Sequence, residues 1–159
     1  MKTKHRKASE HKRRYTADPM AMYWVMGRNE LFTVAEQANL NLPVRLAYDA
    51  MINGQATEPD FHTLAAAVNV AIVCAESIDS LVEQTCIAGR DAMMRVHDRQ
   101  IKLGRWGFDG PGRLEVESCV DVYEQLTSLL TGGQLKQAMS ECIRRMQAGK
   151  VLTHTESTP

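Results

Sequence analysis

The chain has 159 residues, the usual size of one compact domain, and a chain of this length can bury about 70% of its unfolded surface. Apolar residues make up 44% of it and charged residues 24%, a globular composition rather than that of a disordered chain or a coiled-coil rod. No apolar run approaches the ~20 residues that span a bilayer, and no signal-peptide core follows the charged N-terminus. We therefore expect a soluble, cytoplasmic protein without a membrane partner.

The formal net charge of zero hides a basic segment at the N-terminus. Residues 1–15 hold seven Lys/Arg and one acid, a net of +6, so residues 16–159 carry a net of −6. Such a segment favours contact with a polyanion, since every phosphate it neutralises adds salt-dependent affinity. We expect a basic arm over 1–19, and the alternative is a disordered solubilising tail. The candidate nucleic-acid-binding residues of the arm are Lys2, Lys4, Arg6, Lys7, Lys12, Arg13 and Arg14.

The next segments are less regular. Apolar residues alternate over 20–28 as in a strand, but a lone strand has no partner, so we expect a helical turn or an extended packing segment there. A short helix is predicted near 32–39. A second helix is predicted over 42–53, with Asn41 as its N-cap and Pro43 in its first turn.

Strong helical periodicity follows, and it predicts an all-α fold. Four helices are expected over 57–77, 79–103, Pro111 to about 130, and 133–148. Residues expected to face the core are Leu64, Val68, Ile72, Leu114, Val122, Leu126, Leu129, Met139 and Ile143. The prediction is a single-domain bundle of five or six helices over 20–150, antiparallel because its connections are short, followed by a flexible tail over 151–159.

Catalytic and metal chemistry find no support in the sequence. The four cysteines form no CxxC or Cys/His cluster, so we expect reduced cysteines buried as small hydrophobes. The histidines stand in no HExxH or nucleophile motif. We therefore expect a protein that is not an enzyme and that binds no metal and no cofactor.

Residues 33–51 resemble the first helix and turn of a repressor helix-turn-helix. Asn39 could supply the left-handed turn conformation, and Arg45 is then a candidate nucleic-acid-binding residue. The second helix, however, is rich in apolar residues where a recognition helix presents polar ones. The alternative is a pair of core helices with a capped turn between them.

The glycine-rich loop 104–112 has two interpretations. Its glycines match neither phosphate-binding motif. Trp106 and Phe108 either fold back as a hydrophobic plug between the helices or form an exposed anchor that binds a partner protein.

Four stretches of the chain are LPVRLAYDA (42–50), DFHTLAAAVNVAIVCAE (60–76), GRWGFDGPG (104–112) and DVYEQL (121–126). Through these stretches the chain resembles a family of small uncharacterised proteins encoded on plasmids, integrative elements and prophages of proteobacteria. The resemblance implies a mobile-element setting, and it assigns no functional residue. Our first hypothesis is a regulatory protein that binds DNA or a nucleoprotein complex. The alternative is an anti-defence inhibitor, for example an anti-CRISPR protein, that docks on a host protein. The sequence is compatible with either a monomer or a homodimer.

Overall fold

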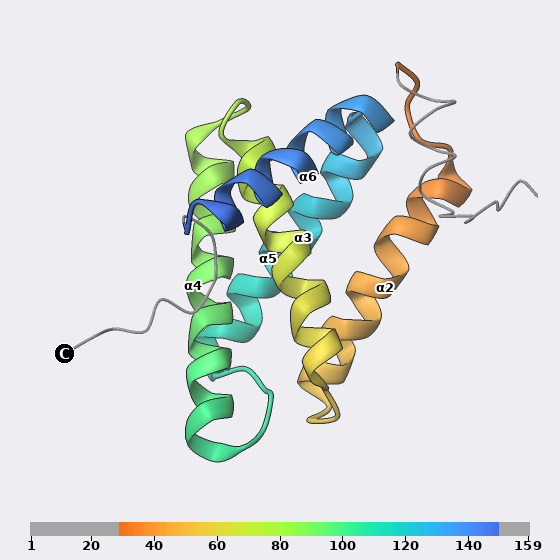
Figure 1. The fold of residues 1–159 in the computed structure, drawn as a ribbon. Coiled ribbons are helices and arrows are strands. Elements are labelled where there is room, and N and C mark those ends of the chain that lie inside the picture. Colours follow the sequence, from red (N-terminus) through yellow and green to blue (C-terminus); the bar gives the residue numbers. More distant parts are fainter. Residues whose placement is uncertain (1–28, 150–159) are drawn as a thin grey trace, which may run out of the picture.

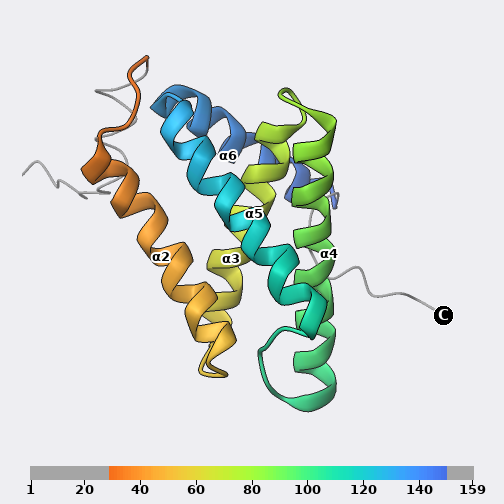
Figure 2. The same ribbon diagram turned by 180° about the vertical axis from the view of Figure 1, so that it is seen from behind.

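Five helices follow one another along residues 29–149, which are the residues that the computed structural model describes (Figure 1). They are α2 (Val34–Ile52), α3 (Glu58–Ala75), α4 (Ser80–Leu103), α5 (Gly110–Leu129) and α6 (Gly132–Gln147). Figures 1 and 2 show α2 and α4 at opposite sides of the bundle, α3 and α5 between them, and α6 laid across one end. The predicted all-α, single-domain bundle is confirmed. The arm 1–19, the irregular segment 20–28 and the tail 151–159 lie outside the described residues.

Local signals explain where the helices begin and end. Oδ1 of Asp79 accepts a hydrogen bond from the N–H of Leu81 at 2.7 Å and so caps α4. Gly104 ends α4 in the left-handed conformation at φ +69°, which favours glycine. At the start of α6, the N–H of Thr131 donates to Gln134 Oε1 at 2.9 Å and the Thr131 hydroxyl accepts from the N–H of Gln134.

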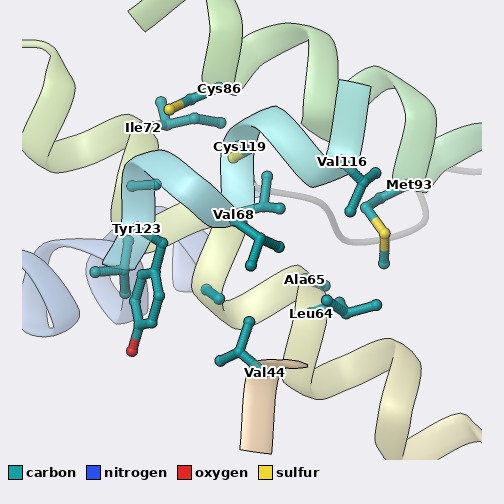
Figure 3. Packing of buried hydrophobic residues seen from close by; sticks show 14 of the residues in the cluster. Val44, Leu64, Ala65, Val68, Ile72, Cys86, Met93, Val116, Cys119 and Tyr123 are labelled. Carbon is teal, nitrogen blue, oxygen red and sulfur yellow. The ribbon is translucent and has the colours of Figure 1, made fainter. Parts of the chain in front are cut away.

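Helix α3 is the centre of the core, because it packs against all four of the other helices. Figure 3 shows Leu64 and Val68 of α3 directed toward side chains of its neighbours. The predictions for Leu64, Val68, Ile72 and Leu126 are confirmed, since each is at most 9% exposed. Val122 is half-buried against the same core.

Four of the predicted core residues are exposed instead. Leu114 is 63% exposed, Leu129 69%, Met139 38% and Ile143 55%. Each lies on a stripe that is apolar in sequence, but α5 and α6 turn a neighbouring stripe inward. The residues buried on that neighbouring stripe are Val116, Cys119, Val120 and Tyr123 in α5 and Leu135, Ala138 and Cys142 in α6.

The prediction of two helices between residues 32 and 53 is wrong, and so is the helix-turn-helix hypothesis. One continuous helix, α2, runs through Pro43. Proline removes one hydrogen bond to the carbonyl four residues back, that of Asn39, and Asn39 lies on the exposed side, where water can replace the missing donor. Asn41 is not an N-cap, because it lies inside α2, whose N-cap is Thr33. Its Oδ1 lies 3.1 Å from the hydroxyl of the buried Thr127 in α5.

Helices α4 and α5 approach each other closely at Gly89. A Cβ built on Gly89 would lie 2.7 Å from Cβ of Cys119, so only glycine fits there without a shift. Four different helices, α3 to α6, each contribute one free, buried cysteine, namely Cys74, Cys86, Cys119 and Cys142. This confirms the prediction that the cysteines are buried, unpaired core residues.

Candidate functional site

The turn between α4 and α5 differs in charge from the rest of the described part of the chain. Residues 95–113 hold five Lys/Arg and two acids, a net of +3. Residues 29–149 together hold 10 Lys/Arg and 16 Asp/Glu, so the described residues outside 95–113 carry a net of −9. The end of α4 and the start of α5 are therefore a positive region on a negative body.

Four cations form what we call the cationic turn: Arg99, Lys102, Arg105 and Arg113. None of them forms an ion pair with a carboxylate within residues 29–149. Lys102, Arg105 and Arg113 are exposed, whereas Arg99 is half-buried and donates from Nη1 to the carbonyl of Phe108 at 3.2 Å. The charge of Arg99 acts on the nearby Asp109 carboxylate, whereas the exposed charges of Lys102, Arg105 and Arg113 remain to attract an external anion.

The loop that carries these cations is held in place by its aromatic residues. The Trp106 ring stacks on the Phe61 ring with a centroid distance of 4.7 Å, and the rings of Phe108 and Tyr48 are 5.5 Å apart. Both loop aromatics are half-buried against the core. This is the packing that the hydrophobic-plug interpretation predicts, while contact of Trp106 and Phe108 with a partner protein stays a prediction.

An ion-pair network fixes the start of α5 beside the loop. Nε of Arg95 donates to Asp109 Oδ2 at 2.8 Å, and Nη2 of the same arginine binds Glu115. The other carboxylate oxygen of Asp109 accepts the N–H of Gly112 at 2.7 Å and so caps α5. The hydrogen bond from Arg95 lowers the pKa of Asp109 below its usual range. Arg95 is therefore a structural cation and does not belong to the cationic turn.

Arg45, the body residue that the sequence suggests for nucleic-acid contact, is engaged within the protein. Its Nε and Nη2 donate to the two carboxylate oxygens of Glu124 at 2.6 and 2.8 Å, and Nη2 also binds Asp121. The hydrogen bond to Glu124 raises the pKa of Arg45 above its usual value. Arg45 thus joins α2 to α5 in an acidic environment, and it lies on neither the arm nor the cationic turn.

A groove lies at the other end of the bundle, between the end of α3 and α6. Its arginines are already paired with carboxylates. Arg145 donates to both carboxylate oxygens of Glu76 at 2.5 and 2.7 Å and also binds Glu141, which in turn binds Arg144. These hydrogen bonds lower the pKa of Glu141 to about 2. The charged groups of the groove satisfy one another, so it offers no net charge to a ligand.

Residues 29–149 contain neither a group of metal-ligating side chains nor a helix that could span a membrane. Within 29–149, no three His, Cys, Asp or Glu side chains are grouped as metal ligands. No helix in that part of the chain is long and apolar enough to cross a membrane. The seven basic residues of the arm, Lys2 to Arg14, lie outside the described residues.

Comparison with known proteins adds no assignment. No protein-family model matches the chain, and neither a curated protein nor a solved structure matches it.

The cationic turn was missed by sequence reasoning, although a signal was present. The local excess of +3 over 95–113 is visible in the sequence, but the acidic residues around it hide it when charge is summed over the whole body.

Proposed function

We propose that the protein binds nucleic acid, or a nucleoprotein complex, and that it is not an enzyme. The observation that carries the proposal is the separation of charge in the body, +3 over residues 95–113 against −9 over the other described residues. In the mobile-element setting that the sequence resemblance implies, such a protein would have a regulatory role in the cytoplasm.

The contact would be made mainly with phosphates. Lys102 and Arg105 stand at the end of a helix and in the loop after it, so no recognition helix presents them to base edges. Phosphate contact needs only positive charge within reach, whereas sequence readout needs side chains held in register. The arm, with a net charge of +6 over residues 1–15, would add affinity of the same kind.

The proposal is tested by measuring the fluorescence anisotropy of labelled duplex DNA at several salt concentrations. A triple variant, K102A/R105A/R113A, should weaken binding and reduce the slope of log K against log salt by up to about 0.9 for each phosphate that the protein no longer neutralises. The matched control is Lys136→Ala, which removes an exposed cation of α6 that has no ion pair among residues 29–149. Lys136→Ala should leave affinity and slope nearly unchanged.

Deletion of residues 2–14 separates the arm from the body. It removes seven positive charges and one negative charge and takes the net charge of the chain from 0 to −6. Binding should fall sharply and become much less dependent on salt. If the deletion left affinity and slope unchanged, the arm would be a solubilising tail and the cationic turn would carry the contact alone.

Failure of the full chain to bind DNA or RNA at low salt would refute the proposal. The second candidate function would then be an anti-defence inhibitor, such as an anti-CRISPR protein, that docks on a host protein. It is favoured by the net charge of −6 over residues 29–149, which suits the basic surfaces of nucleic-acid-binding host proteins.

A further inference from the structure

The described part of the chain begins beside the turn between α5 and α6. The N–H of Gly132 donates to the carbonyl of Glu30 at 3.3 Å, and Leu31 forms an antiparallel β-bridge with Thr131. Both ribbon views show these first residues next to the start of α6 (Figures 1 and 2). Because the two paired segments run in opposite directions, the chain before Glu30 is directed toward the first turn of α6, where Gln134 lies.

The groove between α3 and α6 begins at this point. Leu130 and Gln134, on either side of the paired Thr131 in the sequence, both line it. The groove follows α6 from Gln134 to Arg145, a length of about 16 Å for this stretch of helix. Its volume is about 690 Å³, within the range of about 300–1,000 Å³ that is typical of ligand sites. It is therefore large enough for several side chains of a peptide segment.

The walls of the groove favour an apolar, uncharged occupant. Val73 and Leu130 are half-buried there, and Ile78 is 55% exposed. The charged side chains that line the groove are two arginines and two glutamates, and they form ion pairs with one another. No charge is left over for a charged ligand, whereas an apolar segment would gain free energy by covering the aliphatic side chains.

The sequence directly before the described residues has the matching chemistry. Residues 19–27, PMAMYWVMG, contain no charged side chain and include Tyr23, Trp24, Val25 and three methionines. Nine extended residues reach up to about 30 Å, nearly twice the length of the groove. Residues 150–159 follow the other end of α6, but they offer only two aliphatic side chains, Val151 and Leu152, among polar and charged ones. Residues 19–27 therefore match the groove better than the C-terminal residues do.

We propose that residues 19–27 dock in the groove between α3 and α6 of the same molecule. The pairing of Leu31 with Thr131 holds the segment next to the groove, so docking is intramolecular, and a short connection of this kind gives an effective concentration in the millimolar range. Trp24 and its apolar neighbours would cover Ile78 and Leu130. Docking does not depend on nucleic-acid binding, and it would fix the point at which the basic arm leaves the helical body.

Fluorescence of Trp24 tests the docking in the full chain without nucleic acid. The chain has two tryptophans, so Trp106→Phe leaves Trp24 as the only one and keeps an aromatic ring against Phe61. We expect blue-shifted emission and weak quenching by acrylamide. Adding Ile78→Glu should shift the emission to the red and raise the quenching constant severalfold, with little change in melting temperature because Ile78 is exposed. The control Leu114→Glu, at an exposed position of α5 outside the groove, should change neither. An exposed Trp24 before Ile78→Glu is added, or the same change in both variants, would overturn the proposal.

Photocrosslinking identifies what the segment contacts. A benzophenone amino acid replaces Tyr23 in one variant and Trp24 in another, because neighbouring residues of an extended segment face opposite sides. After irradiation at low protein concentration, at least one of the two labels should attach within the same molecule to residues 73–78 or 130–145. The same label at Leu114 should not reach those residues. Attachment of both labels elsewhere on the bundle, or crosslinks that form only between two molecules, would refute docking within the chain.

Discussion

Replacing Gly89 by alanine tests how closely α4 and α5 must approach for the bundle to be stable. The new Cβ would lie 2.7 Å from Cβ of Cys119 and 3.3 Å from its Sγ. Both Cβ atoms are fixed to their backbones, so no rotamer change can relieve the shorter contact and the two helices must separate. Overpacking of this kind costs about 1–3 kcal/mol, whereas the higher helix propensity of alanine returns about 1 kcal/mol. Because the contact is rigid, we expect the cost to prevail, with a net loss of up to about 2 kcal/mol in the free energy of unfolding.

Urea denaturation followed by circular dichroism at 222 nm measures this loss. The matched control is Gly110→Ala, because a Cβ on Gly110 meets no atom within 4 Å and its stability should change by less than about 0.5 kcal/mol. A double-mutant cycle adds a second check. In a Cys119→Gly background the contact is absent, so Gly89→Ala should then stabilise the protein by about 1 kcal/mol. If Gly89→Ala stabilised the protein with Cys119 present, the close packing of α4 and α5 would contribute nothing to stability.

Four further outcomes are expected. Leu126→Ala should cost about 2–5 kcal/mol in urea denaturation, whereas Leu129→Ala on the exposed side of α5 should cost less than about 0.5 kcal/mol. Trp106→Ala should lower the melting temperature, because it removes the stacking of Trp106 on α3; an unchanged value would favour the exposed anchor. Glu141, whose pKa is lowered to about 2 in the folded state, stabilises the protein above pH ~4.5 and loses this effect as the pH falls towards 2, so the stability difference between wild type and Glu141→Gln should shrink over that range. Burial raises the pKa of the Cys74 thiol to about 11, so a chromogenic disulfide reagent should react slowly with it at pH 8 and quickly after unfolding.

Sequence signals located the helix ends well wherever the signal was local. A capping side chain or a glycine acts within one turn, so the predicted boundaries of α4 at Asp79 and Gly104 match the structure. The break predicted in α2 rested on the same kind of local evidence, the polar residues Asn39 and Asn41 beside Pro43. The structure instead continues the helix through these residues, and Val44 and Tyr48 of this helix are buried in the core.

Periodicity identified the helices more reliably than their buried faces. Leu126 and Leu129 belong to one apolar stripe in the sequence, yet Leu126 is 5% exposed and Leu129 69%. Which part of a broad stripe turns inward depends on the positions of the neighbouring helices, and the sequence of a single helix does not contain that information.

The candidate site was less accessible to sequence reasoning than the fold. Arg45 is paired with Asp121 and Glu124, which lie 76 and 79 residues away along the chain. No local pattern could therefore show that the charge of Arg45 is neutralised. The positive charge of Lys102 and Arg105 could be read locally, but their lack of carboxylate partners within residues 29–149 became visible only with the fold.

The central position of α3 has a consequence for biosynthesis. From Phe61 to Ala75 this helix contains no acidic residue, lysine or arginine, and most of its surface is covered by the other helices of the bundle. Three of those helices, α4 to α6, are synthesised after it, so a nascent chain without them exposes an uncharged, apolar helix that only α2 can cover. The greatest risk of aggregation therefore falls during translation rather than in the finished protein, and a ribosome stalled before α5 should present α3 to chaperones that bind extended apolar segments.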